Sequence, residues 1–471
     1  HTSDEHPWFE EARKSRHNPY YNYYHWWPAE KGEPPLRLSY FDEEGNAWTY
    51  NKPTDSYYLH YFSRKQPDLN WENPEVRQEI FDMMRFWFDK GIDGFRMDSI
   101  SLIAKDPSFP LIDSKKYPDI FSFYAKEPRL HLYLHEMNRQ VLSKYDCMSV
   151  GEGSAVMVDD VAKFVDPARE ELNMLYHFDA ARIRNTTLPD NPESGIDYSL
   201  IALKKMFTEW DKAVDKGWPS IYLGNHDQPR MVSRFGSDKD EFRALSAKML
   251  ITFLLTMRGT PYWFAGDEIG MRNIRFDRIE DYNDIDTINR YKKAKAEGKD
   301  PQAVLDEQKE TGRDNARTPF QWDRSPEAGF TAGTPWLKVN PDYTWINVAD
   351  EEKDPTSILN YFKKVVSFRK ENPSLIYGSY HLLDAENPQS YTFLRKTGAD
   401  TYLIMLNFSP KAAISTPGID MSNAHVLLDN YGDRSHMAPQ KDITLRPFEA
   451  IVFQLNHPVY ESFIDSLDLL E

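Results

Sequence analysis

The chain has 471 residues, of which 57 are Lys or Arg and 74 are Asp or Glu, so its formal net charge is −17. This length supports a large core, and 40% hydrophobic with 28% charged residues indicate a globular protein. A pI near 5.3 argues against nucleic acid as a partner, and the most apolar stretch, residues 249–257, is too short to cross a membrane. Together with the single cysteine, Cys147, and no leader pattern at the first residues, this predicts a cytoplasmic protein.

Residues 1–72 form the first predicted unit. They are rich in Tyr, Trp and Pro, with turn signals and only short strand-like pieces such as residues 57–62. We expect them to fold as a small inserted subdomain.

Helices and short apolar strands alternate from residue 73 onward. Asn73 and Pro74 suit the start of a helix, and Gly91 suits its end. Strands are predicted at residues 92–97, 148–151, 172–178, 221–223 and 262–264, and helices at residues 130–145, 198–216 and 241–257. This alternation is typical of parallel strands joined by crossover helices, which we expect over residues 73–375. Five strands do not close an eight-stranded barrel by themselves.

The pattern changes near the C-terminus. A helix-like stretch at residues 289–309 is either a structural excursion or a specificity segment beside the cleft. From residue 376 onward, strands at residues 391–395, 401–408 and 449–455 follow one another without helices. We therefore expect an antiparallel β-sandwich over residues 376–471.

Three predicted strand ends carry carboxylates: Asp98, Glu152 and Asp227. A single acid at a strand end is usually structural, but three in succession at the active rim of a parallel barrel indicate chemistry. Arg96 lies two residues before Asp98, so the two side chains share one face of the strand, and the arginine favours an ionised Asp98.

These residues resemble the sequence regions of the α-amylase superfamily, glycoside hydrolase family 13. Gly94-Phe-Arg-Met-Asp98, Gly151-Glu152 and Asn225-His-Asp227 occur in the order of the family motifs. Gln66-Pro-Asp-Leu-Asn70 and the stretch Gly312-Arg-Asp-Asn-Ala-Arg317-Thr-Pro-Phe-Gln-Trp322 are similar to signatures of the oligo-1,6-glucosidase branch. Residues 34–48, which include Phe41, depart from the Asn-Asn-Trp loop pattern of that branch.

The resemblance implies an α/β fold, a (β/α)8 TIM barrel with an inserted subdomain and a C-terminal antiparallel sandwich. It also implies a retaining, exo-acting α-glucosidase that hydrolyses terminal α-linked glucose from short oligosaccharides of the isomaltose or maltose type, or from sucrose. Asp98 is the implied nucleophile, Glu152 the acid/base and Asp227 the transition-state carboxylate. Glu152 must be protonated to act, so we expect neighbouring like charges to raise its pKa. The residues implied for substrate binding are His1, Phe62, Arg96, Ser99, His226, Gln228, Arg313 and Arg317.

His1 resembles the last residue of the motif on the family's third barrel strand. The resemblance then places three barrel strands, two substrate-binding residues and the usual calcium loop upstream of His1. We expect the segment to be inactive alone, and the strand that begins at Ile92 to expose apolar surface or to be covered by a partner from outside the family. The alternative is that the N-terminus is native. No cofactor or metal is expected: His131 and His135, four residues apart on a helix, lack a supporting acid.

Several alternatives stay open. The residue after the nucleophile commonly tracks linkage preference in this branch, and Ser99 matches neither the α-1,6 nor the α-1,4 pattern. Sucrose isomerases or transglucosidases use the same carboxylates, although Gln228 favours a hydrolase. An inactive relative acting as a binding subunit is a third possibility. The expected partner is a small oligosaccharide, and the expected state is a monomer or homodimer.

Overall fold

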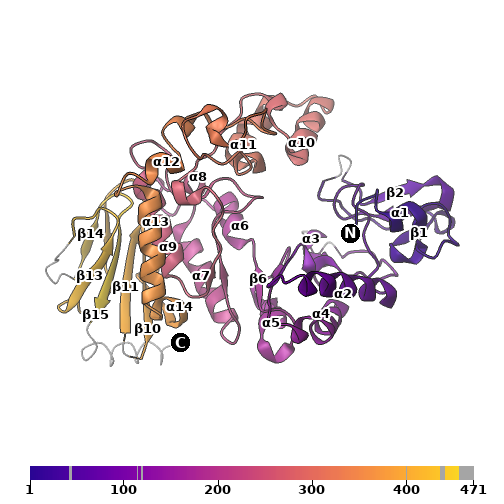
Figure 1. Cartoon of the computed structure of the whole chain (residues 1–471), viewed down its shortest axis with the longest axis horizontal. Helices are drawn as coiled ribbons and strands as arrows, with labels where there is room; N and C mark the ends of the chain where they lie inside the picture. The colour runs from indigo at the N-terminus through magenta and orange to yellow at the C-terminus, as the bar shows by residue number, and fades with distance from the viewer. Residues whose placement is uncertain (42–44, 114, 118–119, 399, 435–440, 456–471) are drawn as a thin grey trace. The chain divides into compact units, whose positions relative to one another are not determined.

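The computed structural model describes residues 1–41, 45–113, 115–117, 120–398, 400–434 and 441–455 (Figure 1). The chain divides into two compact units. The first comprises His1–Phe178 with the short pieces Ala213–Trp218 and Lys295–Glu297. The second comprises Asp179–Lys212, Pro219–Ala294 and the described part of Gly298–Glu471. The predicted boundaries at residues 72 and 375 stay a prediction.

The first unit holds two sheets. The antiparallel sheet has the order β1-β3-β2, and the parallel sheet has the order β4-β5-β6. The strands are β1 (Trp26–Pro28), β2 (Trp48–Asn51), β3 (Ser56–Leu59), β4 (Gly94–Met97), β5 (Met148–Glu152) and β6 (Met174–Tyr176). The helices are α1 (Pro7–Ala12), α2 (Pro74–Asp89), α3 (Ile120–Tyr124), α4 (Arg129–Gln140) and α5 (Ala162–Val165).

The helix α2 begins as its sequence predicts. The Asn73 side chain accepts a hydrogen bond from the backbone N–H of Glu75 at 2.9 Å, and Pro74 occupies the first helical turn. The chain leaves the helix through Gly91, whose φ is +93°. It then enters β4, the outer strand of the parallel sheet, where the Phe95 ring packs 5.0 Å from that of Phe88 on α2.

The antiparallel sheet of the first unit shares its core with a later segment. Trp48, Leu59 and Tyr61 form one apolar cluster with Phe109 and Tyr124, and the rings of Tyr61 and Tyr124 stack at 3.8 Å. The inserted sheet is therefore held by residues that follow β4 in the chain as well as by its own.

The second unit contains the last parallel pair and most of the helices. β7 (Ser220–Ile221) pairs in parallel with β8 (Thr260–Pro261). The helices are α6 (Asp179–Thr186), α7 (Leu200–Ala213), α8 (Met231–Phe235), α9 (Arg243–Thr256), α10 (Ile285–Ala296), α11 (Pro301–Thr311), α12 (Val348–Glu351), α13 (Ile358–Glu371) and α14 (Ser374–Tyr377). All five parallel strands are thus found near their predicted positions, although β7 and β8 are shorter and begin slightly earlier.

A five-stranded antiparallel sheet of order β13-β15-β11-β10-β9 follows in the second unit. Its strands are β9 (Ser379–Leu383), β10 (Ser390–Thr397), β11 (Asp400–Asn407), β13 (Ala424–Asp429) and β15 (Ala450–Leu455). The short pair β12 (Ala413–Ser415) and β14 (Ile443–Leu445) packs on it, because Ile443 and Leu445 share a buried cluster with Leu403 and Phe453. Helix α9 lies against this sheet and beside α13 (Figure 1). Residues 435–440 and 456–471 of the predicted sandwich lie outside the described residues.

The single helix predicted over residues 289–309 is wrong. Two helices, α10 and α11, occupy the region. Gly298 separates them with φ +70°, and the Asp300 side chain caps α11 by accepting from the N–H of Gln302 at 2.9 Å. Pro301 lacks the N–H that a continuous helix would need, so the break is built into the sequence.

Candidate active site

In the first unit, a carboxylate pair shares one arginine at the ends of β4 and β5. Arg96 donates from Nη1 to Asp98 Oδ1 at 2.5 Å and from Nη2 to Glu152 Oε2 at 2.7 Å. β4 and β5 pair in parallel register, Met97 opposite Gly151, which brings the two acids to the same edge of the sheet. The expected contact between Arg96 and Asp98 is confirmed.

The two carboxylates of this pair differ in environment. The Asp98 side chain is 59% exposed, whereas that of Glu152 is 9% exposed. Burial raises the pKa of Glu152 to about 7, the charge and hydrogen bonding of Asp98 add to the rise, and Arg96 opposes it. The predicted direction is correct, but desolvation and not like charge is the main cause. At neutral pH, Glu152 can therefore hold a proton beside an exposed carboxylate.

Ser99 contributes its backbone to the pair. Its N–H donates to Glu152 Oε2 at 3.2 Å, and its φ is +44°, in the left-handed region that a side chain rarely adopts. The residue is buried. Sequence reasoning assigned Ser99 to the substrate; the structure gives it a contact with the acid/base candidate.

In the second unit, Asp227 lies among three basic groups. His226 Nε2 is 3.0 Å from Asp227 Oδ2, Arg317 Nη2 donates to Asp227 Oδ1 at 2.6 Å, and Arg313 Nη1 donates at 3.3 Å. Burial opposes ionisation of this carboxylate, but His226, Arg313 and Arg317 outweigh it and lower the pKa of Asp227 to about 2. Asp227 is consequently an anion at any physiological pH.

Asp284 is a member of this cluster that sequence reasoning missed. Its buried carboxylate accepts from Arg313 Nη2 and lies 3.8 Å from Arg317 Nη1, so it orients both arginines toward Asp227. Asp314 in turn accepts from the backbone N–H of Asp284 at 2.9 Å. Nothing in the local sequence marks Asp284, because it lies in a loop with no strand before it.

The remaining predicted substrate residues are placed as follows. In the first unit, the His1 and Phe62 rings lie 5.3 Å apart, and Tyr40 stacks on Phe62 at 5.2 Å. Phe41, whose place in the departing loop was open, lies 5.8 Å from Phe62. In the second unit, Gln228 is half-buried and its backbone N–H donates to the Asn225 carbonyl at 3.4 Å. The roles of all these residues stay predictions.

The signature Gln66-Pro-Asp-Leu-Asn70 has a structural use. The buried carboxylate of Asp68 accepts from the Tyr61 N–H at 2.6 Å and from the Lys105 ammonium at 3.2 Å. Gln66 Nε2 lies 3.1 Å from His1 Nε2. The motif thus ties the antiparallel sheet to the segment after β4.

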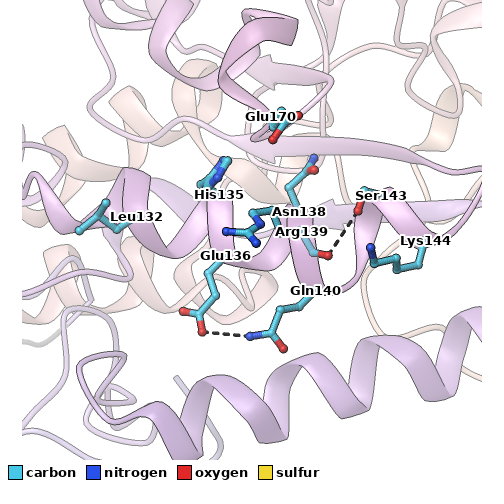
Figure 2. Close-up of a pocket in the computed structure, with 9 residues that line it drawn as sticks. All are labelled: Leu132, His135, Glu136, Asn138, Arg139, Gln140, Ser143, Lys144 and Glu170. Carbon is cyan, nitrogen blue, oxygen red and sulfur yellow. Dashed lines mark hydrogen bonds between the residues drawn. The ribbon is translucent and has the colours of Figure 1, made fainter.

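A surface pocket of about 580 Å³ runs along α4 and is lined by His135, Glu136, Arg139 and Glu170, among others (Figure 2). His135 Nδ1 contacts the Arg169 carbonyl, and His131 Nδ1 pairs with Glu171 at 2.8 Å. Within the described residues, no cluster of three or more His, Cys, Asp or Glu is arranged to hold a metal ion. None of the described helices is long and apolar enough to cross a membrane.

Known proteins resemble the chain over nearly its whole length. The family model described as "Alpha amylase, catalytic domain" matches residues 1–378. Oligo-1,6-glucosidases from Parageobacillus thermoglucosidasius and Bacillus cereus are 48% and 44% identical to it, over 97% of this chain and 82% of theirs. The crystal structure of a trehalulose synthase, MutB, in complex with Tris has a TM-score of 0.90 at 38% identity, covering 97% of this chain and 82% of that one.

The parallel strands, the antiparallel C-terminal sheet and these likenesses define a glycoside hydrolase of the TIM-barrel class. Within that class, the chain belongs to the α-amylase family, because the family model spans most of its length.

Proposed function

We propose that the chain is a retaining, exo-acting α-glucosidase that releases terminal α-linked glucose from short oligosaccharides. The observation that carries the proposal is the shared guanidinium of Arg96, which links an exposed Asp98 to a buried Glu152 with a pKa of about 7. A retaining glycosidase needs two neighbouring carboxyl groups, one ionised to attack and the other protonated to donate.

In the proposed reaction, Asp98 attacks the anomeric carbon while Glu152 protonates the leaving oxygen. This forms a covalent glycosyl-enzyme and releases the aglycone. Glu152, now ionised, removes a proton from water, and the water displaces Asp98 with a second inversion. Arg96 stabilises the carboxylate charge that moves between the two residues, since it donates to both.

We assign Asp227 the role of a fixed anion that favours positive charge developing on the sugar ring. Its low pKa supports this role, because a carboxylate that stayed protonated would offer no such stabilisation. His226, Arg313 and Arg317 are proposed to hold sugar hydroxyls as well as the carboxylate. His1 and Phe62 are proposed as an aromatic wall for the terminal glucose, which suits the apolar face of a sugar ring.

The test is hydrolysis of isomaltose, maltose and p-nitrophenyl α-glucoside, with the first sugar product followed by proton NMR. We expect α-glucose to appear before it mutarotates to the β-anomer. Isomaltose is the first substrate to try because the relatives at 48% and 44% identity are named oligo-1,6-glucosidases. Initial release of β-glucose would contradict the double displacement.

A sucrose isomerase is the second candidate, because a trehalulose synthase shares the fold at 38% identity. The higher identity of the glucosidases favours hydrolysis. Incubation with sucrose separates the two: a hydrolase yields glucose and fructose, whereas an isomerase yields a new disaccharide. A chain that bound sugar without any turnover would indicate a binding subunit.

Three further parts of the proposal depend on the sequence: a cytoplasmic location, a monomeric or homodimeric state, and activity without a cofactor. Cell fractionation, light scattering and an assay after exhaustive treatment with a chelator test them in turn.

A further inference from the structure

A second pocket lies within the first unit, between the loop that precedes β2 and the segment that follows β4. It encloses about 170 Å³. The residues that matter for its chemistry are Arg37, Tyr61, Lys105, Asp106, Phe109 and Phe123. Arg37 belongs to residues 34–48, where the chain departs from the loop pattern of the branch that it resembles.

The guanidinium of Arg37 is buried and only partly satisfied. The residue is 1% exposed. Nη1 donates to the Leu36 carbonyl and Nη2 to the Pro110 carbonyl, each at 2.8 Å. The centres of the Phe109 and Phe123 rings each lie 5.7 Å from the guanidinium carbon Cζ. Its Nε has no hydrogen-bond partner, and no carboxylate of the described residues forms an ion pair with it. A buried charge left in this state is unfavourable.

The buried arginines of the chain differ in how well they are satisfied: Arg230 Nε and Arg234 Nη2 also lack a hydrogen-bond partner, whereas Arg369 and Arg395 are well bonded. In the second unit, Arg369 donates to four backbone carbonyls. Arg395 donates from Nε, Nη1 and Nη2, again to carbonyls. Arg37 combines a guanidinium N–H that has no partner with a place on the wall of a pocket.

Lys105 brings a second buried cation to the same pocket. Its ammonium donates to Asp68 at 3.2 Å and lies 4.8 Å from the centre of the Tyr61 ring. Asp68 thus balances one of the two cations.

Two carboxylates line the pocket itself. Asp106 is partly exposed and accepts from Ser108 N–H and Oγ, and Glu127 pairs with Arg129 at 2.8 Å. Neither of them forms an ion pair with Arg37, so among the described residues its charge is not directly paired.

We propose that this pocket binds one small oxyanion of the phosphate or sulfate class, with Arg37 as its main ligand. A planar guanidinium matches the oxygens of such an anion and supplies the missing counter-charge. The volume corresponds to roughly six waters at ~30 Å³ each, which leaves room for an inorganic anion. The bound ion would join the loop of Arg37 to the segment after β4, beside Tyr61 and the neighbouring Phe62.

The test is equilibrium dialysis of the whole chain with labelled phosphate at fixed ionic strength. We expect one saturable site, from which sulfate displaces phosphate but equimolar chloride and glucose do not. Arg37→Met should weaken binding by at least about tenfold, because the main ligand is lost. Lys52→Met removes one exposed cation of the same unit and should leave binding unchanged.

Asp106→Asn gives a second variant that keeps the turn hydrogen bonds and removes one repulsive charge. It should tighten phosphate binding about two- to fivefold. If Arg37→Met does not fold, the phosphate affinity of Asp106→Asn tests the proposal instead. Absence of saturable binding, displacement by glucose, equal affinity in the Arg37 and Lys52 variants, or an unchanged affinity in Asp106→Asn would each overturn the proposal.

Discussion

Arg96 links two carboxyl groups that must hold different protonation states for the proposed chemistry. Because its guanidinium donates to both, the negative charge on Asp98 is balanced while burial keeps a proton on Glu152. The side chain of Asp98 is 59% exposed, so a substrate can reach its carboxylate. The division of roles is thus set by burial and not by residue type.

Replacing Asp98 by Asn removes the nucleophile and retains the shape of the side chain. We expect kcat for isomaltose to fall at least ~10³-fold while the far-UV spectrum and unfolding midpoint stay close to those of the parent. Asp93→Asn, an exposed acid just before β4, is the matched control and should keep near-normal turnover. An active Asp98→Asn variant would remove the assignment.

The pKa of Glu152 gives a prediction for the pH dependence of catalysis. As the acid, Glu152 must be protonated in the free enzyme, so kcat/KM should fall as the pH rises through about 7. Isomaltose is the substrate to use, because p-nitrophenolate leaves with little help from an acid. Glu152→Gln should remove this basic limb as well as most of the activity. A profile that stays flat well above neutral pH would contradict the assignment of Glu152 as the acid.

At the scale of single residues, the sequence predicts the charged residues of the site but not the groups that bind and orient them. Asp98, Glu152 and Asp227 are recognisable because each ends an apolar strand, and Arg96 is recognisable from its spacing to Asp98. The backbone contact of Ser99 depends on a positive φ that no residue pattern specifies. Asp284 depends on a loop brought to Arg313 by the fold, which local sequence does not encode.

At the scale of elements, the pairing of β4 with β5 depends on a glycine. A Cβ on Gly94 would lie 1.9 Å from the Met148 carbonyl oxygen, so the two backbones approach too closely for any side chain. The Arg96–Glu152 contact depends on that register.

Gly94→Ala should therefore lower the free energy of unfolding by about 2–4 kcal/mol and reduce activity with it. Gly91→Ala is the comparison: its φ is +93° but its Cβ would meet open space, so it should cost only about 1–2 kcal/mol. Urea unfolding followed by fluorescence measures both. Equal destabilisation in the two variants would show that the close approach of the Gly94 and Met148 backbones is not what makes a side chain unfavourable at position 94.

Helices and strands could be predicted where the hydrophobic periodicity and the residues that begin or end the element lie close together in the sequence. The start of α2 follows from Asn73 and Pro74, and the five parallel strands follow from short apolar runs after helices. The prediction of a single helix over residues 289–309 is wrong because the apolar residues keep helical spacing across Gly298, whereas the helical conformation of the backbone is interrupted there. Phe109 and Tyr124 join the core of the antiparallel sheet through tertiary packing, and no local sequence signal predicts that contact.

At the scale of the whole molecule, acidic residues outnumber basic ones. The stability therefore depends on whether each buried carboxyl group has a cation close enough to neutralise its charge. Glu351 and Glu449 are both buried, at 7% and 0% exposure, but their pKa values move in opposite directions. Burial raises the pKa of Glu351 to about 7, because its nearest cation, Arg243, is 3.8 Å away. Burial also opposes ionisation of Glu449, but Arg434 and Arg446 donate to it and lower its pKa.

These shifts have opposite consequences for stability. A carboxyl group whose folded pKa is raised holds its proton in the native state after the unfolded chain has lost it. Glu351 therefore removes stability as the pH rises from about 4.5 to about 7. Glu449 has a lowered folded pKa, so its contribution is present above the ordinary value of 4.5 and is lost as the pH falls.

Glu351→Gln should thus flatten the decline in stability between weakly acidic and neutral pH by about 1–3 kcal/mol, since the amide still accepts from the Leu359 N–H. Glu449→Gln should instead destabilise the protein at neutral pH by about 3–5 kcal/mol, because Arg434 loses the counter-charge of Glu449 and Arg446 keeps only Asp433. Urea unfolding of both variants and the parent at several pH values measures the effects. Parallel pH profiles for all three proteins would show that these two groups titrate alike in the folded and unfolded chain, and would contradict the assigned shifts.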